Sequence, residues 1–397
     1  MPLIGIEEEF LLVDTAGRLA NSADEVLAHP LNDGSVVKES SHAVVEINTP
    51  PASSLHELDR EERRIVKRLE QMAADNGLRA IPVSVLGPEP PLLRSEGRYG
   101  ANTVVRGDDR NRHYASTLGL HIHLDTRSDA TRQYNLLQSM DPSFAFLSTS
   151  PYLLGENTMN DRRVYEQRYI IFERYPLHAQ LPGYARSQTD IDAQDEERFA
   201  QWLAPLNPEQ AAYYTPEDTN WGPIRRREKT LELRNSDTNL HSLVMAQAAL
   251  YRGVDAKVFH DGLDVRTSNT YGLLDDAILI PSHERLRVLE RAAFRRGLKD
   301  EAVHAYLSYL VDLAEDGLPA DERHYLAPFK TMLATRTNIA DVLALRAASE
   351  QRGARLNPEA AATVNRYVSA LAVRDRREGI EDVLRGVAHE GIHYFAA

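Results

Sequence analysis

Three short runs of the chain alternate apolar residues with acidic or histidine side chains at the period of a β-strand. The runs are Gly5–Phe10, Leu118–Asp125 and Leu231–Asp237. Side chains two positions apart share one face of a strand, so each run would separate its charged residues from its apolar ones. Acidic side chains on one sheet face repel each other unless a metal ion or a cationic ligand compensates them. The pattern therefore predicts a sheet with one buried face and one face that forms a metal-binding cleft.

The composition is that of an ordinary globular protein, with 42% hydrophobic and 26% charged residues. The net charge of −13 gives no support for binding to nucleic acid or to a membrane surface. The absence of cysteine excludes disulfides, thiolate ligands and a cysteine nucleophile. No segment has the pattern of a signal peptide or of a membrane span. We expect a cytoplasmic protein acting on small molecules, and leave a homo-oligomer open.

Hydrophobic periodicity predicts the order of the elements. We expect strands over residues 3–13, 44–48, 78–86, 118–125 and 231–237, and helices over 54–76, 129–140 and 240–259. Residues 92–112 predict a long functional loop, and residues 155–195 predict irregular excursions over the cleft. The fold class is α+β: a curved, mostly antiparallel sheet forms a cupped active site with helices outside. We expect one catalytic domain over 1–397, with a sheet-rich core over 1–260 and a helical C-terminal third over 261–397.

The first strand carries three consecutive glutamates. Glu7 and Glu9 share one face, and Glu8 points to the other. Acidic residues on an edge strand can have no role other than preventing aggregation. Three of them within an otherwise apolar strand favour a functional site instead. Glu46 lies in the second expected strand, and Glu39 in the loop before it could reach the same cleft. Carboxylate oxygens suit Mg²⁺ or Mn²⁺, the ions that accompany nucleotide phosphates.

The later runs add nitrogen ligands and positive charge. His121 and His123 share a strand face at a common metal-ligand spacing, although a single histidine is more often just hydrogen-bonded. Glu232 and Arg234 also share a face, either as an ordinary ion pair or as a site that holds a cation and a transferring phosphoryl group. The cluster Arg225-Arg226-Arg227 adds donors for phosphate oxygens, so we predict that Arg225 and Arg227 bind a nucleotide.

Taken in order, these runs resemble the type-2 glutamate–cysteine ligase family of carboxylate–amine ligases. The family motifs are G-x-E-x-E, an acid seven positions before a Glu, G-L-H-x-H and E-V-R-x-x-D-T. They are matched here by Gly5-Ile6-Glu7-Glu8-Glu9, by Glu39 and Glu46, by Gly119-Leu120-His121-Ile122-His123, and by Glu232-Leu233-Arg234-Asn235-Ser236-Asp237-Thr238. The resemblance covers about residues 3–260 and implies a cupped antiparallel sheet, distantly like that of glutamine synthetase.

The resemblance also implies a reaction. ATP would phosphorylate the side-chain carboxylate of glutamate, and an amine, cysteine or another amino compound, would displace phosphate to give a γ-glutamyl amide. The implied cofactors are ATP and Mg²⁺ or Mn²⁺. The implied roles are metal ligands at Glu7, Glu39, Glu46, His121 and Glu232, catalytic groups at Arg234 and Glu9, and binding of a substrate carboxylate by Arg162 or Arg163.

This sequence departs from the family pattern around the substrate pocket. Trp221-Gly222-Pro223-Ile224-Arg225 lacks the proline of the family's W-x-x-R-P segment, Asp125 stands where glycine is frequent, and residues 92–112 have no counterpart. Ligase chemistry is therefore better supported than glutamate or cysteine as the substrates. The roles of His123 and Asp125 stay open.

Two other functions are weighed against the ligase. A dinuclear metal-dependent hydrolase of the barrel type also carries an H-x-H strand, but on its first strand rather than at residue 121. A nucleotide- and metal-binding protein without turnover is the other alternative, and the intact acids with Arg234 argue against it. His389-Glu390-Gly391-Ile392-His393 matches the zinc-protease pattern H-E-x-x-H, but a glycine interrupts it close to the last residue. We interpret it as the end of a helix.

Overall fold

The computed structural model describes residues 1–157, 159–350 and 355–394, with side chains described as far as residue 388. Its central sheet has the strand order β2-β3-β1-β5-β9-β8, and β4 pairs with part of β1. Every pairing in this sheet is antiparallel, and the sheet does not close on itself. The strands are β1 (Ile4–Asp14), β2 (Val36–Lys38), β3 (Val44–Asn48), β4 (Leu78–Ile81), β5 (Gly119–Asp125), β8 (Ile224–Arg226) and β9 (Thr230–Asp237). The predicted α+β fold with an antiparallel sheet is confirmed.

The register of the strands gathers the predicted site on one face. Glu7 of β1 lies opposite His121 of β5, and Glu9 lies opposite Glu46 of β3. On the other side of β5, His123 lies opposite Glu232 of β9. Directly opposed residues of antiparallel strands point to the same face. Segments more than 200 positions apart in the sequence therefore contribute to one surface.

Helices cover the opposite face. Helix α2 (Leu55–Asp75) begins where the Ser54 side chain accepts a hydrogen bond from the Glu57 N–H, and helix α10 (His241–His260) follows β9 directly. Part of the apolar surface of β1 and β3 packs against α2 in one buried cluster, which contains Phe10, Leu12, Val45 and Ile47. Glu8 points into this covered face, where it accepts hydrogen bonds from the Thr238 hydroxyl at 2.9 Å and the Asn239 N–H at 3.2 Å. Glu8 is thus separated from its neighbours in the sequence and lies outside the cleft.

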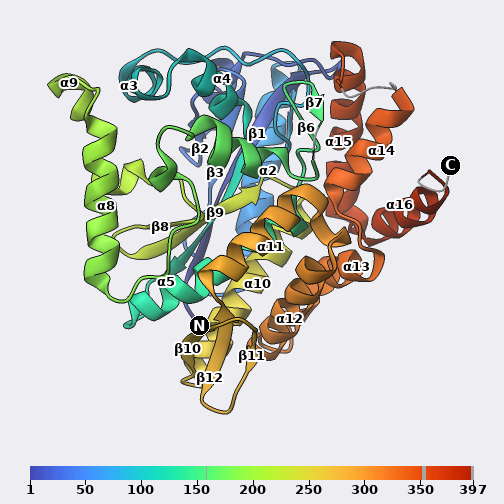
Figure 1. Ribbon diagram of the computed structural model, residues 1–397. Coiled ribbons are helices and arrows are strands. Elements are labelled where there is room, and N and C mark those ends of the chain that lie inside the picture. The colour runs from blue at the N-terminus through green and yellow to red at the C-terminus, as the bar shows by residue number, and fades with distance from the viewer. Residues whose placement is uncertain (158, 351–354, 395–397) are drawn as a thin grey trace.

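The last third of the chain is helical, as predicted. It contains α11 (His283–Arg296), α12 (Glu301–Gly317), α13 (Ala327–Thr335), α14 (Ile339–Glu350), α15 (Pro358–Glu378) and α16 (Glu381–Tyr394). Figure 1 shows these helices together on one side of the sheet. Their buried residues, such as Leu310 and Leu371, belong to the same core cluster as Ile4 of β1. None of the described helices is long and apolar enough to cross a membrane. The side chains of the H-E-x-x-H pattern lie outside the described residues.

The structure corrects the prediction of a loop over residues 92–112. Two helices occupy this region, α3 (Gly97–Arg106) and α4 (Asp108–Ser116). Gly107, with φ of 80°, separates them. Ala101 and Val105, one helical turn apart, are buried in an aromatic cluster with Trp202 and Trp221. Tertiary packing of this kind stabilises helices whose sequence has a weak intrinsic preference.

Other boundaries also differ from the prediction. The strand predicted over 78–86 ends at Ile81, and the region 155–195 contains α7 (Arg162–Tyr165), a π-helical turn (Glu166–Ile171) and the start of α8 (Gln188–Leu203). A small separate sheet was not predicted; it is formed by β10 (Asp264–Ser268), β11 (Gly272–Leu273) and β12 (Ala277–Pro281). The remaining short elements are α1 (Ala23–Leu27), α5 (Ala130–Ser139), α6 (Phe144–Leu147), β6 (Tyr152–Leu153), β7 (Glu156–Asn157) and α9 (Pro208–Ala211).

Candidate active site

A cavity of about 230 Å³ lies on the uncovered face of the central sheet. Its charged lining has two parts, an acidic one of Glu7, Glu9, Glu39 and Glu46 and a basic one of Arg98, Arg225, Arg227 and Arg234. The rest of the lining is Ser40, Tyr99, Asn102, Tyr114, His121 and Trp221. A larger cavity of about 530 Å³ between the turn after β1 and α15 contains none of the predicted site residues. The chemistry therefore locates the site in the smaller cavity.

The first cluster of candidate metal ligands is Glu7, His121 and Glu232, whose ligand atoms all lie within 4.8 Å of one another. The His121 Nδ1 lies 3.2 Å from Glu7 Oε2 and 3.7 Å from Glu232 Oε1. Burial opposes the charge of Glu7, but hydrogen bonds with His121 and His123 outweigh it and hold its pKa below the usual range. Burial, helped by Arg234, lowers the pKa of His121 to about 4. His121 is thus in the neutral form that binds a metal.

The second cluster consists of three carboxylates, Glu9, Glu39 and Glu46, again with ligand atoms within 4.8 Å. Burial and the charge of Glu39 raise the pKa of Glu9 to about 8. The same two causes raise the pKa of Glu46 well above its usual value. A divalent cation bound among three such oxygens would remove the repulsion and restore the ionised forms. The donor set, made only of carboxylates, suits Mg²⁺ or Mn²⁺.

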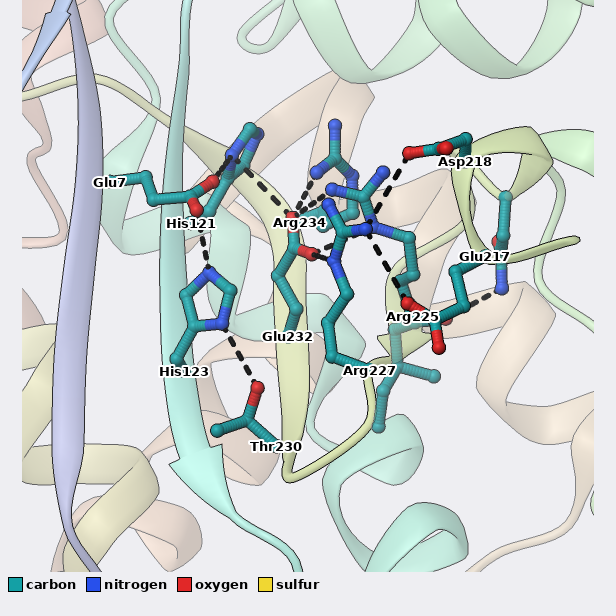
Figure 2. A network of polar contacts seen from close by, with 12 residues as sticks. Glu7, His121, His123, Glu217, Asp218, Arg225, Arg227, Thr230, Glu232 and Arg234 are labelled. Carbon is teal, nitrogen blue, oxygen red and sulfur yellow. Dashed lines mark hydrogen bonds and ion pairs between the residues drawn. The ribbon is translucent and has the colours of Figure 1, made fainter. Parts of the chain in front are cut away.

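Glu232 is surrounded by arginines. Arg225 donates to both of its oxygens, at 2.7 and 2.6 Å, and Arg227 Nε donates at 2.9 Å. Arg234 contacts the same carboxylate, and Figure 2 shows the three guanidinium groups converging on it. Burial alone would raise the pKa of Glu232, but Arg225 and Arg234 outweigh burial and hold it well below the usual range. Three cations thus lie directly beside the first metal-ligand cluster.

A second cavity, of about 520 Å³, lies along the same sheet face and shares Glu7 with the first. Much of its lining is apolar; the full set is Leu3, Ile4, Gly5, Ile6, Glu7, Asn48, Thr49, Pro51, His123, Asp125, Lys229 and Thr230. His123 connects β1 and β9 in this lining, because its Nε2 lies 3.3 Å from Glu7 Oε1 and its Nδ1 lies 3.1 Å from the Thr230 hydroxyl. Asp125 accepts a hydrogen bond from the Leu3 N–H. His123 and Asp125, whose roles the sequence analysis left open, therefore belong to this second cavity.

The two arginines predicted to bind a substrate carboxylate do not line either cavity. Arg162 forms an ion pair with Glu156 at 3.4 Å and contacts Glu166. Arg163 is buried against β5 on the same face as His121, with its Nε 3.9 Å from Asp237. A Cβ atom on Gly119 would lie 2.4 Å from the Arg163 Nη2, so a larger residue at this position would displace the Arg163 guanidinium. The substrate-binding roles of Arg162 and Arg163 stay a prediction.

Gly119 has a second contribution to the site. Its N–H donates to Glu9 Oε2 at 2.7 Å and so fixes the carboxylate of the second cluster. The first residue of the G-L-H-x-H run therefore positions a metal-ligand candidate on the neighbouring strand.

Several cavity residues were not predicted. Arg98, Tyr99 and Asn102 come from α3, and Tyr114 comes from α4. These helices lie over one end of the sheet in Figure 1. The spacing of Arg98 and Asn102, four positions apart, would have indicated a common helix face. The interpretation of this segment as a loop concealed that spacing.

Comparisons with known proteins find relatives in sequence and in fold. The model of glutamate–cysteine ligase family 2 matches residues 3–356. A relative from Rhodococcus jostii assigned as glutamate–cysteine ligase 2-1 is 26% identical, over 81% of this chain and 86% of its own length.

Two solved structures have a similar fold. A glutamate–cysteine ligase from Francisella tularensis in complex with AMP has a TM-score of 0.56 at 14% identity, covering 100% of this chain and 94% of that one. A bifunctional glutathione synthetase from Pasteurella multocida has a TM-score of 0.59 at 13% identity, covering 94% of this chain. This chain spans about half of that longer protein (52%).

Proposed function

The chain belongs to glutamate–cysteine ligase family 2, and from this premise we propose that it is an ATP-dependent ligase that activates the side-chain carboxylate of glutamate. The activated species is an acyl phosphate, and an amine displaces its phosphate to form a γ-glutamyl amide. One observation carries the proposal: two clusters of metal-ligand candidates and four arginines lie together at a single cavity. Transfer of a phosphoryl group between two anionic reactants requires this combination of cations and preorganised donors.

The two cavities suggest a division of labour. The cavity of about 520 Å³ has the apolar surface that a nucleotide base needs, and the cavity of about 230 Å³ has the charged groups that a carboxylate donor needs. Glu7 lines both, so the triphosphate would cross from one to the other at the first metal-ligand cluster. Arg225 and Arg227, already beside Glu232, would then bind phosphate oxygens.

In the reaction, an oxygen of the glutamate side chain attacks the terminal phosphorus and ADP leaves. The amine nitrogen then attacks the acyl carbon, phosphate leaves, and the nitrogen loses a proton. Mg²⁺ or Mn²⁺ held by the two clusters would supply positive charge to the phosphate oxygens. Arg234, buried and held by Glu232, stabilises the charge that develops on the transferring group. Arg234 and the other buried residues that line the cavity also exclude water, which would otherwise hydrolyse the acyl phosphate.

Of the two alternative functions, the fold argues against the hydrolase. A hydrolase of the barrel type needs a closed sheet of parallel strands, whereas the central sheet described here is open and antiparallel. A binding protein without turnover has the same site geometry as a ligase, so only an assay separates the two.

Hydroxylamine provides that assay, because it replaces an unknown amine. The enzyme is incubated with ATP, Mg²⁺, glutamate and hydroxylamine, and both glutamyl hydroxamate and ADP are measured. We expect equal amounts of the two products. If neither product forms with glutamate or with any other carboxylate tested, the protein has no ligase turnover.

A further inference from the structure

Of the four arginines in the cavity, one differs from the others. Arg225, Arg227 and Arg234 all contact Glu232, beside the first metal-ligand cluster. Arg98 instead belongs to α3 and reaches the cavity from outside the sheet. It therefore reaches the cavity from a different element than the other three arginines.

Arg98 is held in place by two contacts that leave it able to bind a ligand. Its Nη1 lies 3.3 Å from Asp218 Oδ1, and its guanidinium carbon lies 5.4 Å from the centre of the Tyr214 ring. The Tyr214 hydroxyl in turn lies 3.2 Å from the Arg98 carbonyl oxygen, which fixes this turn of α3. The position of the guanidinium is thus determined before any ligand binds.

The ion pair with Asp218 holds one end of the Arg98 guanidinium. The Arg98 side chain is 40% exposed, so its other donors can reach a ligand in the cavity, whereas the Asp218 side chain is only 14% exposed. Asp218 also lies 3.6 Å from Arg227, so its charge is shared between two guanidinium groups. Arg98 forms no other ion pair among the described residues. Its planar fork can therefore take a second carboxylate in bidentate geometry.

The neighbours of Arg98 fit the rest of an α-amino acid. Tyr99 and Asn102, on the same helix, also line the cavity and can hydrogen-bond to a polar ligand. Basic and acidic groups in the lining of one small cavity match a molecule that carries both a carboxylate and an ammonium group.

We propose that Arg98 binds the α-carboxylate of an amino-acid substrate and so restricts the enzyme to α-amino acids. The proposal rests on the ligase function above. Both reactants of such a ligase can carry an α-carboxylate: the glutamate that is activated and the amine that attacks it. The experiment therefore has one arm for each.

In the first arm, hydroxylamine is the amine and the donor is either glutamate or 4-aminobutanoate, which lacks only the α-carboxylate. In the second arm, glutamate is the donor and the amine is either cysteine or cysteamine, which again lacks only the carboxylate. ADP release gives kcat/KM for each substrate. The wild-type enzyme should prefer the complete amino acid in at least one arm.

Arg98→Met should reduce that preference by about 10- to 100-fold, as expected for loss of a charge-assisted bidentate contact, and should leave the truncated substrate nearly unaffected. The arm in which this happens identifies the amino acid that Arg98 binds. Arg112→Met is the matched control, because Arg112 is exposed on the adjacent helix α4 and pairs only locally with Asp109. Arg98→Lys replaces the methionine variant if the latter does not fold, and should also lose the preference, since lysine lacks the fork.

Unchanged preferences in both arms, for an Arg98 variant that folds, would overturn the inference. So would a wild-type enzyme that prefers the complete amino acid in neither arm. A wild-type enzyme that yields no glutamyl hydroxamate would overturn the proposed function itself, which is a separate result.

Discussion

Glu46 is a buried carboxylate whose charge the fold itself does not compensate. It is 8% exposed and accepts a hydrogen bond from the Asn48 side-chain amide at 3.2 Å. Burial and the nearby Glu39, Glu7 and Glu9 raise its pKa. A carboxyl group whose pKa is higher in the folded protein than in the unfolded chain destabilises the folded protein at neutral pH. Such a residue is retained for a function, here binding a cation.

Glu46→Gln should therefore have opposite effects on activity and on stability. It removes a charge and a metal-ligand candidate while keeping the shape, so we expect turnover to fall at least about 100-fold. The melting temperature without added metal should rise by about 2 °C or more, because the repulsion is relieved. Glu196→Gln, at an exposed position of α8, is the control and should change neither.

Thermal melting with and without Mn²⁺ completes the Glu46 test. The wild-type protein should be stabilised by the metal, and Glu46→Gln should lose most of that stabilisation. A variant that keeps wild-type turnover would remove Glu46 from the site.

For individual residues, the sequence predicted which side chains lie at the site better than it predicted the contacts of those side chains. The alternation in each strand correctly placed Glu7, Glu9, His121 and Glu232 on one face. It could not show that three arginines would converge on Glu232, because that contact depends on how β8 and β9 pair and on rotamers. The α3 contribution to the cavity depended on tertiary packing and was missed.

Among the elements, the strands and the long helices were predictable, and α3 and α4 were not. The strand pattern has a period of two and is supported by burial on one face, which specifies it strongly. Helix α2 has a capping serine and an apolar stripe that packs on the sheet. Neither α3 nor α4 has a side-chain cap, and the apolar stripe of α3, which includes Ala101 and Val105, packs against residues about 100 positions away, such as Trp202.

The contact between α2 and α10 contains a charged histidine. His241, at the start of α10, lies 2.6 Å from Asp59 Oδ1 and contacts Glu62, both on α2. Burial opposes its charge, but Glu62 and Asp59 outweigh burial, and the pKa rises to about 9 from 6.5. The other charged groups near this histidine are Arg63, Glu8 and Asp375.

His241 should therefore make stability depend on pH with a definite sign. Its contribution is fully present below pH of about 6.5, the unfolded pKa, and is lost as the pH rises through about 9. The difference in free energy of unfolding between the wild type and His241→Gln should shrink by on the order of 2 kcal/mol between pH 6 and pH 9.5, measured by urea titration.

His260→Gln is the control for the His241 prediction, since His260 ends the same helix and its side chain is 90% exposed. This variant should show no comparable trend. A constant difference across the pH range for His241→Gln would mean that His241 is neutral in the folded protein.

For the whole molecule, the order of the strands explains how distant segments form one site. β1 is central and pairs with β3 on one side and β5 on the other, so its glutamates contribute to both metal-ligand clusters. The sequence predicted the class of fold and an open face with acids. It could not predict the strand order or the existence of two cavities joined at Glu7, because both depend on long-range pairing.

The most direct test of the central claim follows an oxygen atom. Glutamate labelled with ¹⁸O in its side-chain carboxylate is incubated with the enzyme, ATP, Mg²⁺ and hydroxylamine, and the released phosphate is analysed by mass spectrometry. If an acyl phosphate forms, one labelled oxygen should appear in inorganic phosphate, with ADP as the other product. Release of AMP and pyrophosphate, or of phosphate without label during amide formation, would contradict the account.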